Sequence, residues 1–263
     1  MTFLIVGFLF VIGLVIGSFL NVVILRGERG EGLGGRSRCM ACGRILGISE
    51  LVPVASFIFQ HGRCRGCRER FSVQYPLVEL GTALAFAGIA WFFVPVLMGG
   101  GTAISAQALL NLGVLLLAAC AAIVIFVADF RFQIIPVGAV IVLGLAGIVV
   151  TLGRNTLLGD LAAVIGCSLF FFLLSYVSGG RWMGNGDWML VFATSLVIGF
   201  PSSIAAFLFS FWLGSIVGLT LLALGKKSLQ SRIPFGPFIL AGALLAWRYA
   251  DAFFAYTGLS LLL

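Results

Sequence analysis

The stretch FLIVGFLFVIGLVIGSFLNVVIL, residues 3–25, carries no charged side chain. A helix of this length crosses the hydrocarbon core of a membrane, which is about 30 Å thick and needs roughly 20 apolar residues. No basic segment precedes the run, it exceeds the usual length of a signal-peptide core, and it continues into a charged loop. We therefore expect it to stay in place as a membrane anchor.

Seven more apolar runs follow, at residues 76–98, 104–128, 134–152, 157–178, 188–200, 203–224 and 237–261. The chain is 61% hydrophobic and only 10% charged, with a mean hydropathy of +1.19. Soluble domains do not have this composition. We predict an all-α polytopic membrane protein with about eight transmembrane helices, of which the sixth is short and bounded by glycine and proline.

Lysine and arginine gather on one side of this predicted topology. If the N-terminus lies outside, every basic residue except Arg154 and Arg248 falls in one of four segments: 26–75, 129–133, 179–187 and 225–236. Because cytoplasmic loops are enriched in lysine and arginine, these four segments are predicted to be cytoplasmic. The net charge of +7 then reflects topology and contact with anionic lipid, and we expect no nucleic-acid partner.

The segment 26–75 is the only sizeable polar insert, and it contains two CxxC pairs separated by 21 residues. Each pair can present two thiolates from one tight turn, and four thiolates suit a tetrahedral zinc ion in a small zinc-ribbon-like fold. The alternatives are two disulfides or four free thiols, but disulfides rarely persist in the cytoplasm. We predict a structural zinc site with these ligands: Cys39, Cys42, Cys64 and Cys67.

The remaining cysteines and the single histidine exclude several hydrolytic mechanisms. Cys120 and Cys167 lie inside apolar runs, as small buried residues do. His61 is in the polar insert, outside every predicted span, so neither an HExxH metal site nor a membrane-embedded Ser–His pair is available. A Ser–Lys dyad would need Lys226 or Lys227, which both lie in a loop.

Two of the four aspartates are predicted to lie at the same depth on the cytoplasmic side. Asp129 ends the third span and Asp187 opens the sixth, whereas Asp160 and Asp251 lie toward the outer face. Two adjacent carboxyl groups share a proton, so that one activates water and the other donates to a carbonyl. The pair Asp129 and Asp187 therefore predicts an aspartyl protease.

The sequence GNGD, residues 184–187, adds two glycines to this candidate site. Gly184 and Gly186 are expected to permit a close approach of a substrate strand and backbone conformations closed to other residues. The alternative interpretation has Asp187 as a helix N-cap, and Asp129 as a helix-end charge paired with Arg131.

Six motifs in order resemble the prepilin peptidases, or type IV leader peptidases, of the bacterial inner membrane. They are GSFLNVVILR (17–26), the two CxxC pairs, FSVQYPLVEL (71–80), VADFRFQIIP (127–136), MGNGDWML (183–190) and RIPFGPFIL (232–240). The resemblance implies that Asp129 and Asp187 are the catalytic aspartates. Met189 stands where that family usually has a lysine.

The resemblance also implies an activity. Such enzymes cut the basic leader from type IV prepilins and type II secretion pseudopilins after a glycine, on the cytoplasmic side. Many of them then N-methylate the new N-terminal residue with S-adenosylmethionine. The rival hypotheses are a non-catalytic scaffold for pilus or secretion assembly, and a transporter that uses the two aspartates as a proton relay.

Three further expectations concern single positions and domains. Glu79 is an intramembrane acid and so a candidate for substrate or methyl-donor handling, while Asn21 is expected to form a hydrogen bond between helices. Pro234, Gly236 and Pro237 are expected to shape a loop near the site. The predicted division is a first helix (1–25), a zinc-binding insert (26–75) and a peptidase core (76–263).

Overall fold

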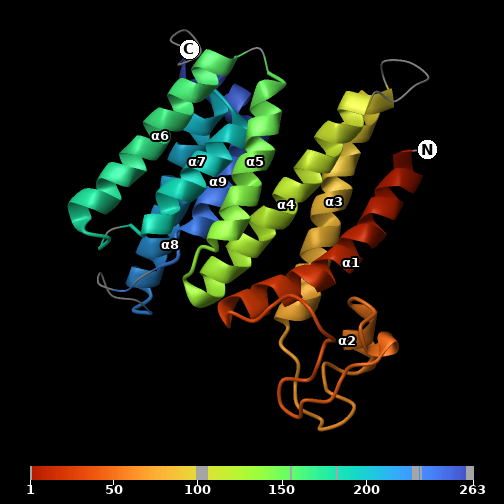
Figure 1. Cartoon of the computed structure of the whole chain (residues 1–263). Helices are drawn as coiled ribbons and strands as arrows, with labels where there is room; N and C mark the ends of the chain where they lie inside the picture. The colour runs from red at the N-terminus through yellow and green to blue at the C-terminus, as the bar shows by residue number, and fades with distance from the viewer. Residues whose placement is uncertain are drawn as a thin grey trace. The chain divides into compact units, whose positions relative to one another are not determined.

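A computed structural model gives the fold of the chain (Figure 1). It describes residues 2–98, 106–154, 156–181, 183–226, 231 and 233–258, with the side chains of 95–98 excluded. Lys227 and Arg232 of the predicted cytoplasmic loops, and the ends 104–105 and 259–261 of two predicted spans, lie outside the described residues. The chain divides into two compact units, Met1–Val124 and Ile125–Leu263, with the boundary inside one long helix.

Each of the eight predicted spans falls on one helix. These are α1 (Thr2–Glu28), α3 (Gln74–Met98), α4 (Ala106–Phe132), α5 (Val137–Leu152), α6 (Leu157–Ser178), α7 (Asn185–Ile198), α8 (Ser202–Ala223) and α9 (Gly236–Thr257). Six of them are long and apolar enough to cross a membrane, whereas α5 and α7 have only 16 and 14 residues. At 1.5 Å per residue, α5 and α7 span about 24 and 21 Å, less than a full hydrocarbon core. The prediction of an all-α polytopic protein is confirmed.

In the first unit, α1 and α3 pack so closely that glycine is required on α1. A Cβ atom added to Gly13 would lie 2.6 Å from the Cα atom of Ala83, and one added to Gly17 would lie 2.6 Å from the Cα atom of Glu79. Glycines four residues apart let two apolar helices approach backbone to backbone. Asn21, one turn further along, donates to the Tyr75 carbonyl over 3.1 Å, which confirms the predicted hydrogen bond between helices.

The polar insert holds two cysteine turns of the same construction. In the first, the backbone N–H of Cys39 donates to the Arg44 carbonyl, and Gly43 has φ +70°. In the second, the backbone N–H of Cys64 donates to the Glu69 carbonyl. Arg68, which occupies the position that matches Gly43, has φ +64°. An isolated antiparallel bridge closes each turn, and two short elements lie between the turns: η1 (Ile48–Glu50) and α2 (Ala55–Phe59).

The second unit is a helical bundle built around the short helix α7. This helix packs against four others, α5, α6, α8 and α9, as Figure 1 shows. Leu190 and Ala193 of α7 are almost completely buried. The first turn of α7 carries Asp187, so the helix that holds this aspartate is also the helix that the rest of the unit surrounds.

Candidate active site

Asp187 lies in the first turn of α7 and is only 6% exposed. Its Oδ2 atom accepts a 2.8 Å hydrogen bond from the backbone N–H of Gly184, which is the N-cap residue. The first N–H groups of a helix have no partner within the helix, and a carboxylate three residues after the cap satisfies one of them. The alternative interpretation, in which Asp187 is itself the N-cap, is therefore wrong, because Gly184 is the N-cap. The Asp187 carboxylate does accept a hydrogen bond from that N-cap residue.

Asp129 lies in the last turn of α4 and is 5% exposed. Its Oδ2 atom accepts a 2.8 Å hydrogen bond from the backbone N–H of Gly236, the first residue of α9. The nearby Arg131 guanidinium lies over the ring of Phe132, 5.3 Å from the centroid. Gly236 was expected only to shape a nearby loop, and sequence reasoning missed its direct contact with the aspartate.

The segment that follows Asp129 touches the first turn of α7, which carries Asp187. A Cβ atom built on Gly186 would lie 2.9 Å from the Cβ atom of Ile135, which is closer than side chains tolerate. This contact joins the end of α4 to the start of α7 within the second unit. The two carboxyl groups lie near enough for the charge of Asp129 to act on Asp187. The structure thus brings the two predicted catalytic residues together.

The two glycines of the GNGD sequence act differently from the expectation. Gly184 has φ −69° and ψ 151°, a conformation that any residue adopts, and Gly186 lies in the helix. The expectation of backbone conformations closed to other residues is therefore wrong. A side chain does lie close to the backbone of Gly186, but it is the Ile135 side chain of the protein itself. The expected approach of a substrate strand stays a prediction.

Helix α6 fixes the turn that leads into α7. The Ser175 hydroxyl of α6 lies 2.8 Å from Oδ1 of Asn185 and 3.2 Å from the carbonyl of Met183. The ring of Trp188 packs edge-on against Phe172 of α6, with centroids 5.6 Å apart. Met189, which is half-buried, follows directly. These contacts fix the position of the turn before Asp187, and of the first turn of α7, relative to α6.

The other two aspartates have different surroundings. Asp160 is completely buried, and its Oδ1 atom accepts a 2.6 Å hydrogen bond from the backbone N–H of Phe200. Its Oδ2 atom lies 3.8 Å from the Arg154 guanidinium, which also donates to carbonyls at the end of α7. Asp160 therefore ties together loops at the end of the bundle, while Asp251 is exposed on α9.

Glu79 belongs to α3 in the first unit and is 6% exposed. Its carboxylate accepts a 2.7 Å hydrogen bond from the backbone N–H of Val54, in the insert, and a bond from the Ser18 side chain. Val54 has φ +59°, which is unusual for a β-branched residue. Glu79 therefore anchors the insert to the helix pair, and its suggested role in substrate or methyl-donor handling stays a prediction.

The four predicted metal ligands form one cluster in the first unit. Their sulfur atoms all lie within 4.8 Å of one another, and those of Cys39 and Cys67 are 3.8 Å apart. A tetrahedral zinc ion with bonds of about 2.3 Å has its sulfur ligands about 3.8 Å apart, so the cluster fits such an ion. Backbone N–H groups of Cys67 and Gly66 lower the pKa of Cys64 to about 7, which favours the thiolate.

Two family models match this sequence: Bacterial Peptidase A24 N-terminal domain at residues 11–93, and Type IV leader peptidase family at residues 116–219. The prepilin leader peptidase/N-methyltransferase of Bacillus subtilis (strain 168) is 30% identical, over 94% of this chain and 96% of that protein. A protein of the same name from Pseudomonas putida is 32% identical, over 93% of this chain and 91% of its own length. No solved structure matches the chain. The chain belongs to the type IV leader peptidase family.

Proposed function

We propose that this protein is a prepilin leader peptidase that also N-methylates its product. It cuts the basic leader from type IV prepilins and type II secretion pseudopilins after a glycine, and methylates the residue that becomes N-terminal. The observation that carries the peptidase assignment is the pair of buried carboxyl groups at the ends of α4 and α7, Asp129 and Asp187. The relatives named as prepilin leader peptidase/N-methyltransferase supply the substrate class and the second activity.

The chemistry of the pair follows from its shared proton. The ionised carboxylate removes a proton from a water molecule, whose oxygen attacks the scissile carbonyl carbon. The protonated carboxyl group donates to the carbonyl oxygen as the tetrahedral intermediate forms. Collapse of the intermediate breaks the C–N bond, and the departing amine takes up a proton. The hydrogen bonds from Gly184 and Gly236 orient the two carboxyl groups for these transfers.

The protein acts from the bacterial inner membrane with residues 26–75 in the cytoplasm. The distribution of basic residues supports this orientation, which also puts Asp129 and Asp187 at the cytoplasmic surface. A substrate with a basic leader and an apolar stem would present its cleavage point at that depth. On this proposal, residues 76–263 form the peptidase core and residues 1–25 anchor the insert.

Zinc is the proposed metal of the four-cysteine cluster, with a structural role. Four thiolates leave no open coordination position, so the ion closes the insert and takes no part in peptide hydrolysis. His61 is exposed in the same insert and is not a proposed ligand. S-adenosylmethionine, when bound, supplies an electrophilic methyl group for the second reaction.

The test is cleavage of a synthetic substrate by the purified protein in liposomes. The peptide carries a basic leader, then glycine, phenylalanine and an apolar stem, and its mass is followed with and without S-adenosylmethionine. We expect a cut after the glycine in both samples and the mass of one added methyl group only with the donor. Absence of any cut across a panel of such peptides would contradict the proposal in favour of the non-catalytic scaffold, and dependence of activity on a proton gradient would favour the transporter.

A further inference from the structure

The polar insert contains one apolar segment, residues 48–59, between its two cysteine turns. Its sequence is ISELVPVASFIF, and it includes η1 and α2. Five of its large apolar side chains are between 39% and 87% exposed: Ile48, Leu51, Val52, Ile58 and Phe59. Its only charged residue, Glu50, is buried and bonds to Arg44. Apolar side chains that gather on a surface in this way mark a contact with a protein or a membrane.

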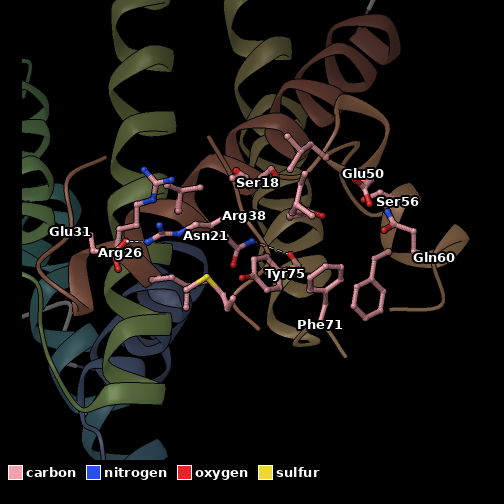
Figure 2. A pocket seen from close by; sticks show the side chains of 18 of the residues that line it. Ser18, Asn21, Arg26, Glu31, Arg38, Glu50, Ser56, Gln60, Phe71 and Tyr75 are labelled. Atoms are coloured by element: carbon pink, nitrogen blue, oxygen red, sulfur yellow. Dashed lines mark hydrogen bonds and ion pairs between the residues drawn. The ribbon is translucent and has the colours of Figure 1, made fainter. Parts of the chain in front are cut away.

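A different set of side chains joins this segment to the helix pair α1 and α3. Ser56, Phe57 and Gln60 line a small cavity between the insert and the two helices. Figure 2 shows Glu50, Ser56 and Gln60 together at one end of it. The most exposed apolar residues of the segment take no part in this lining: Ile48, Val52, Ile58 and Phe59. The segment therefore packs on the helix pair with one set of side chains and leaves the other set exposed.

Two hydrogen bonds to Glu79 hold the segment beside the membrane spans. The Glu79 carboxylate accepts the Val54 N–H over 2.7 Å and also a bond from the Ser18 side chain. Ser18 lies in the apolar run of α1, and Glu79 lies five residues after Gln74, the first residue of α3, which is about 7.5 Å along the helix axis. Both helices are long and apolar enough to cross a membrane. Val54 is thus held beside the first turns of α3, where Leu77 is also exposed.

The backbone of the segment suits surroundings that offer no hydrogen-bond partners. Lipid supplies none, so the N–H groups of a segment that enters it must bond within the protein. The N–H groups of Ser56 and Ile58 donate to the carbonyls of Val52 and Val54. Val54, the N-cap residue of α2, donates its own N–H to Glu79. The buried carboxylate therefore satisfies a backbone group that lipid would leave unpaired.

Exposed arginines flank the apolar segment on both sides in the sequence. They are Arg36, Arg38, Arg44, Arg63, Arg65, Arg68 and Arg70. Between residues 36 and 70 the only acids are Glu50 and Glu69. An apolar surface beside basic residues is typical of an element that lies in the interface of an anionic membrane. The same charge disfavours two other occupants, because a basic pilin leader would be repelled and a second copy of the chain would bring two sets of arginines together.

We propose that residues 48–59 lie in the interface of the membrane, with their exposed apolar side chains among the ends of the acyl chains nearest the headgroups. Elements of this kind enter the boundary between headgroups and acyl chains by about 5–10 Å. The flanking arginines then contact anionic headgroups, and Glu79 holds the segment at this depth. On the proposed topology this is the cytoplasmic leaflet. The proposal concerns the insert alone and does not depend on peptide cleavage.

The test measures how deeply single positions lie in lipid. The fluorescent amino acid dansylalanine replaces Ile58 or Phe59 in the full chain, which is reconstituted in vesicles that contain phosphatidylglycerol. Ile45, 52% exposed in the first cysteine turn, is the matched control, and Val15, 57% exposed in the middle of α1, reports on the acyl core. Quenchers are lipids with a nitroxide near the carbonyl end or near the methyl end of the acyl chain, and iodide in the water. The melting temperature establishes that each labelled chain is folded.

We expect the labels at positions 58 and 59 to be quenched at least twofold by the lipid nitroxides, and more strongly by the nitroxide near the carbonyl end. The label at position 15 should respond more strongly to the nitroxide near the methyl end. The label at position 45 should be quenched by iodide and not by either lipid.

Three results would overturn the proposal. Quenching of positions 58 and 59 by iodide alone would put the segment in water and make it a docking surface for a soluble partner. Protection of both positions from lipid and iodide would mean that protein covers them, for example a second copy of the chain. Equal lipid quenching at position 45 would mean that the contact is not a property of this segment.

Discussion

Gly236 donates its backbone N–H to Oδ2 of Asp129 over 2.8 Å, although 107 residues separate the two in sequence. A Cβ atom at position 236 would lie only 2.6 Å from the same oxygen. The glycine therefore serves the site in two ways, because it supplies a donor and leaves room for the carboxylate. Through this contact the start of α9 fixes the orientation of an aspartate at the end of α4.

The substitution Gly236→Ala is expected to displace the Asp129 carboxylate and to lower leader cleavage by about 100-fold, since a shift of about 1 Å costs that much in an ordered active site. Gly138→Ala is the matched control, because Gly138 also lies in the first turn of a helix and a Cβ there meets nothing within 4 Å. The measurement is the cleavage rate of the peptide substrate. Equal rates for the two variants would mean that the Gly236 contact does not position Asp129.

The substitution Gly186→Ala places a methyl group 2.9 Å from the Cβ atom of Ile135. Overpacking of this kind costs about 1–3 kcal/mol, and here it pushes the segment after α4 away from the start of α7. We expect a lower melting temperature and reduced cleavage together. Gly166→Ala, in α6 with no atom near the added Cβ, should change neither. A stable and fully active Gly186→Ala variant would contradict the tight contact.

Asp160 is expected to be important for stability and not for chemistry. Asp160→Ala leaves the Phe200 N–H without its acceptor and removes the partner of Arg154, which costs about 1–3 kcal/mol. Asp251→Ala removes an exposed aspartate and should stay within about 0.5 kcal/mol of the unchanged chain. Thermal unfolding measures both. If Asp160→Ala abolished cleavage while the protein remained as stable as before, the structural role would be wrong.

The zinc site is expected to hold one ion per chain and to weaken as the pH falls. Protons compete with the metal for the thiolates, and the competition increases below pH 7, where Cys64, with a pKa of about 7, becomes protonated in the metal-free cluster. Cys39→Ser should lose the ion and unfold the insert, whereas Cys120→Ser, outside the cluster, should keep it. Elemental analysis against pH measures the ion. Zinc retained by Cys39→Ser would exclude the four-cysteine site.

The scarcity of acidic residues made the aspartate pair predictable from sequence. With one histidine and four aspartates in the chain, few hydrolytic mechanisms are available. The spans predicted from hydropathy then put Asp129 and Asp187 at the same depth in the membrane. The eight helices could also be predicted. A single apolar run of membrane length has to satisfy its backbone hydrogen bonds within itself, and a helix does so. The shortness of α7 was visible in the glycine and proline that bound the sixth predicted span, whereas the shortness of α5, which begins only at Val137, was not predicted.

Contacts between distant segments could not be predicted in this way. The bond from Gly236 to Asp129 and the packing of Ile135 on Gly186 depend on how helices are placed, and no local pattern encodes that placement. The expected backbone conformations of the GNGD glycines were wrong, because Gly184 is extended and Gly186 is helical, while the close approach of a substrate strand stays a prediction.

The central claim is that Asp129 and Asp187 together hydrolyse the leader peptide. The most direct test compares Asp129→Asn, Asp187→Asn and the exposed control Asp251→Asn in liposomes with the same peptide substrate. Asparagine keeps an oxygen for the Gly236 and Gly184 N–H groups but cannot share or transfer the proton, so both site variants should remain folded. We predict that both are inactive and that Asp251→Asn cuts at the rate of the unchanged chain. Cleavage by either site variant at the rate of that control would contradict the claim and leave the two aspartates as structural residues at helix ends.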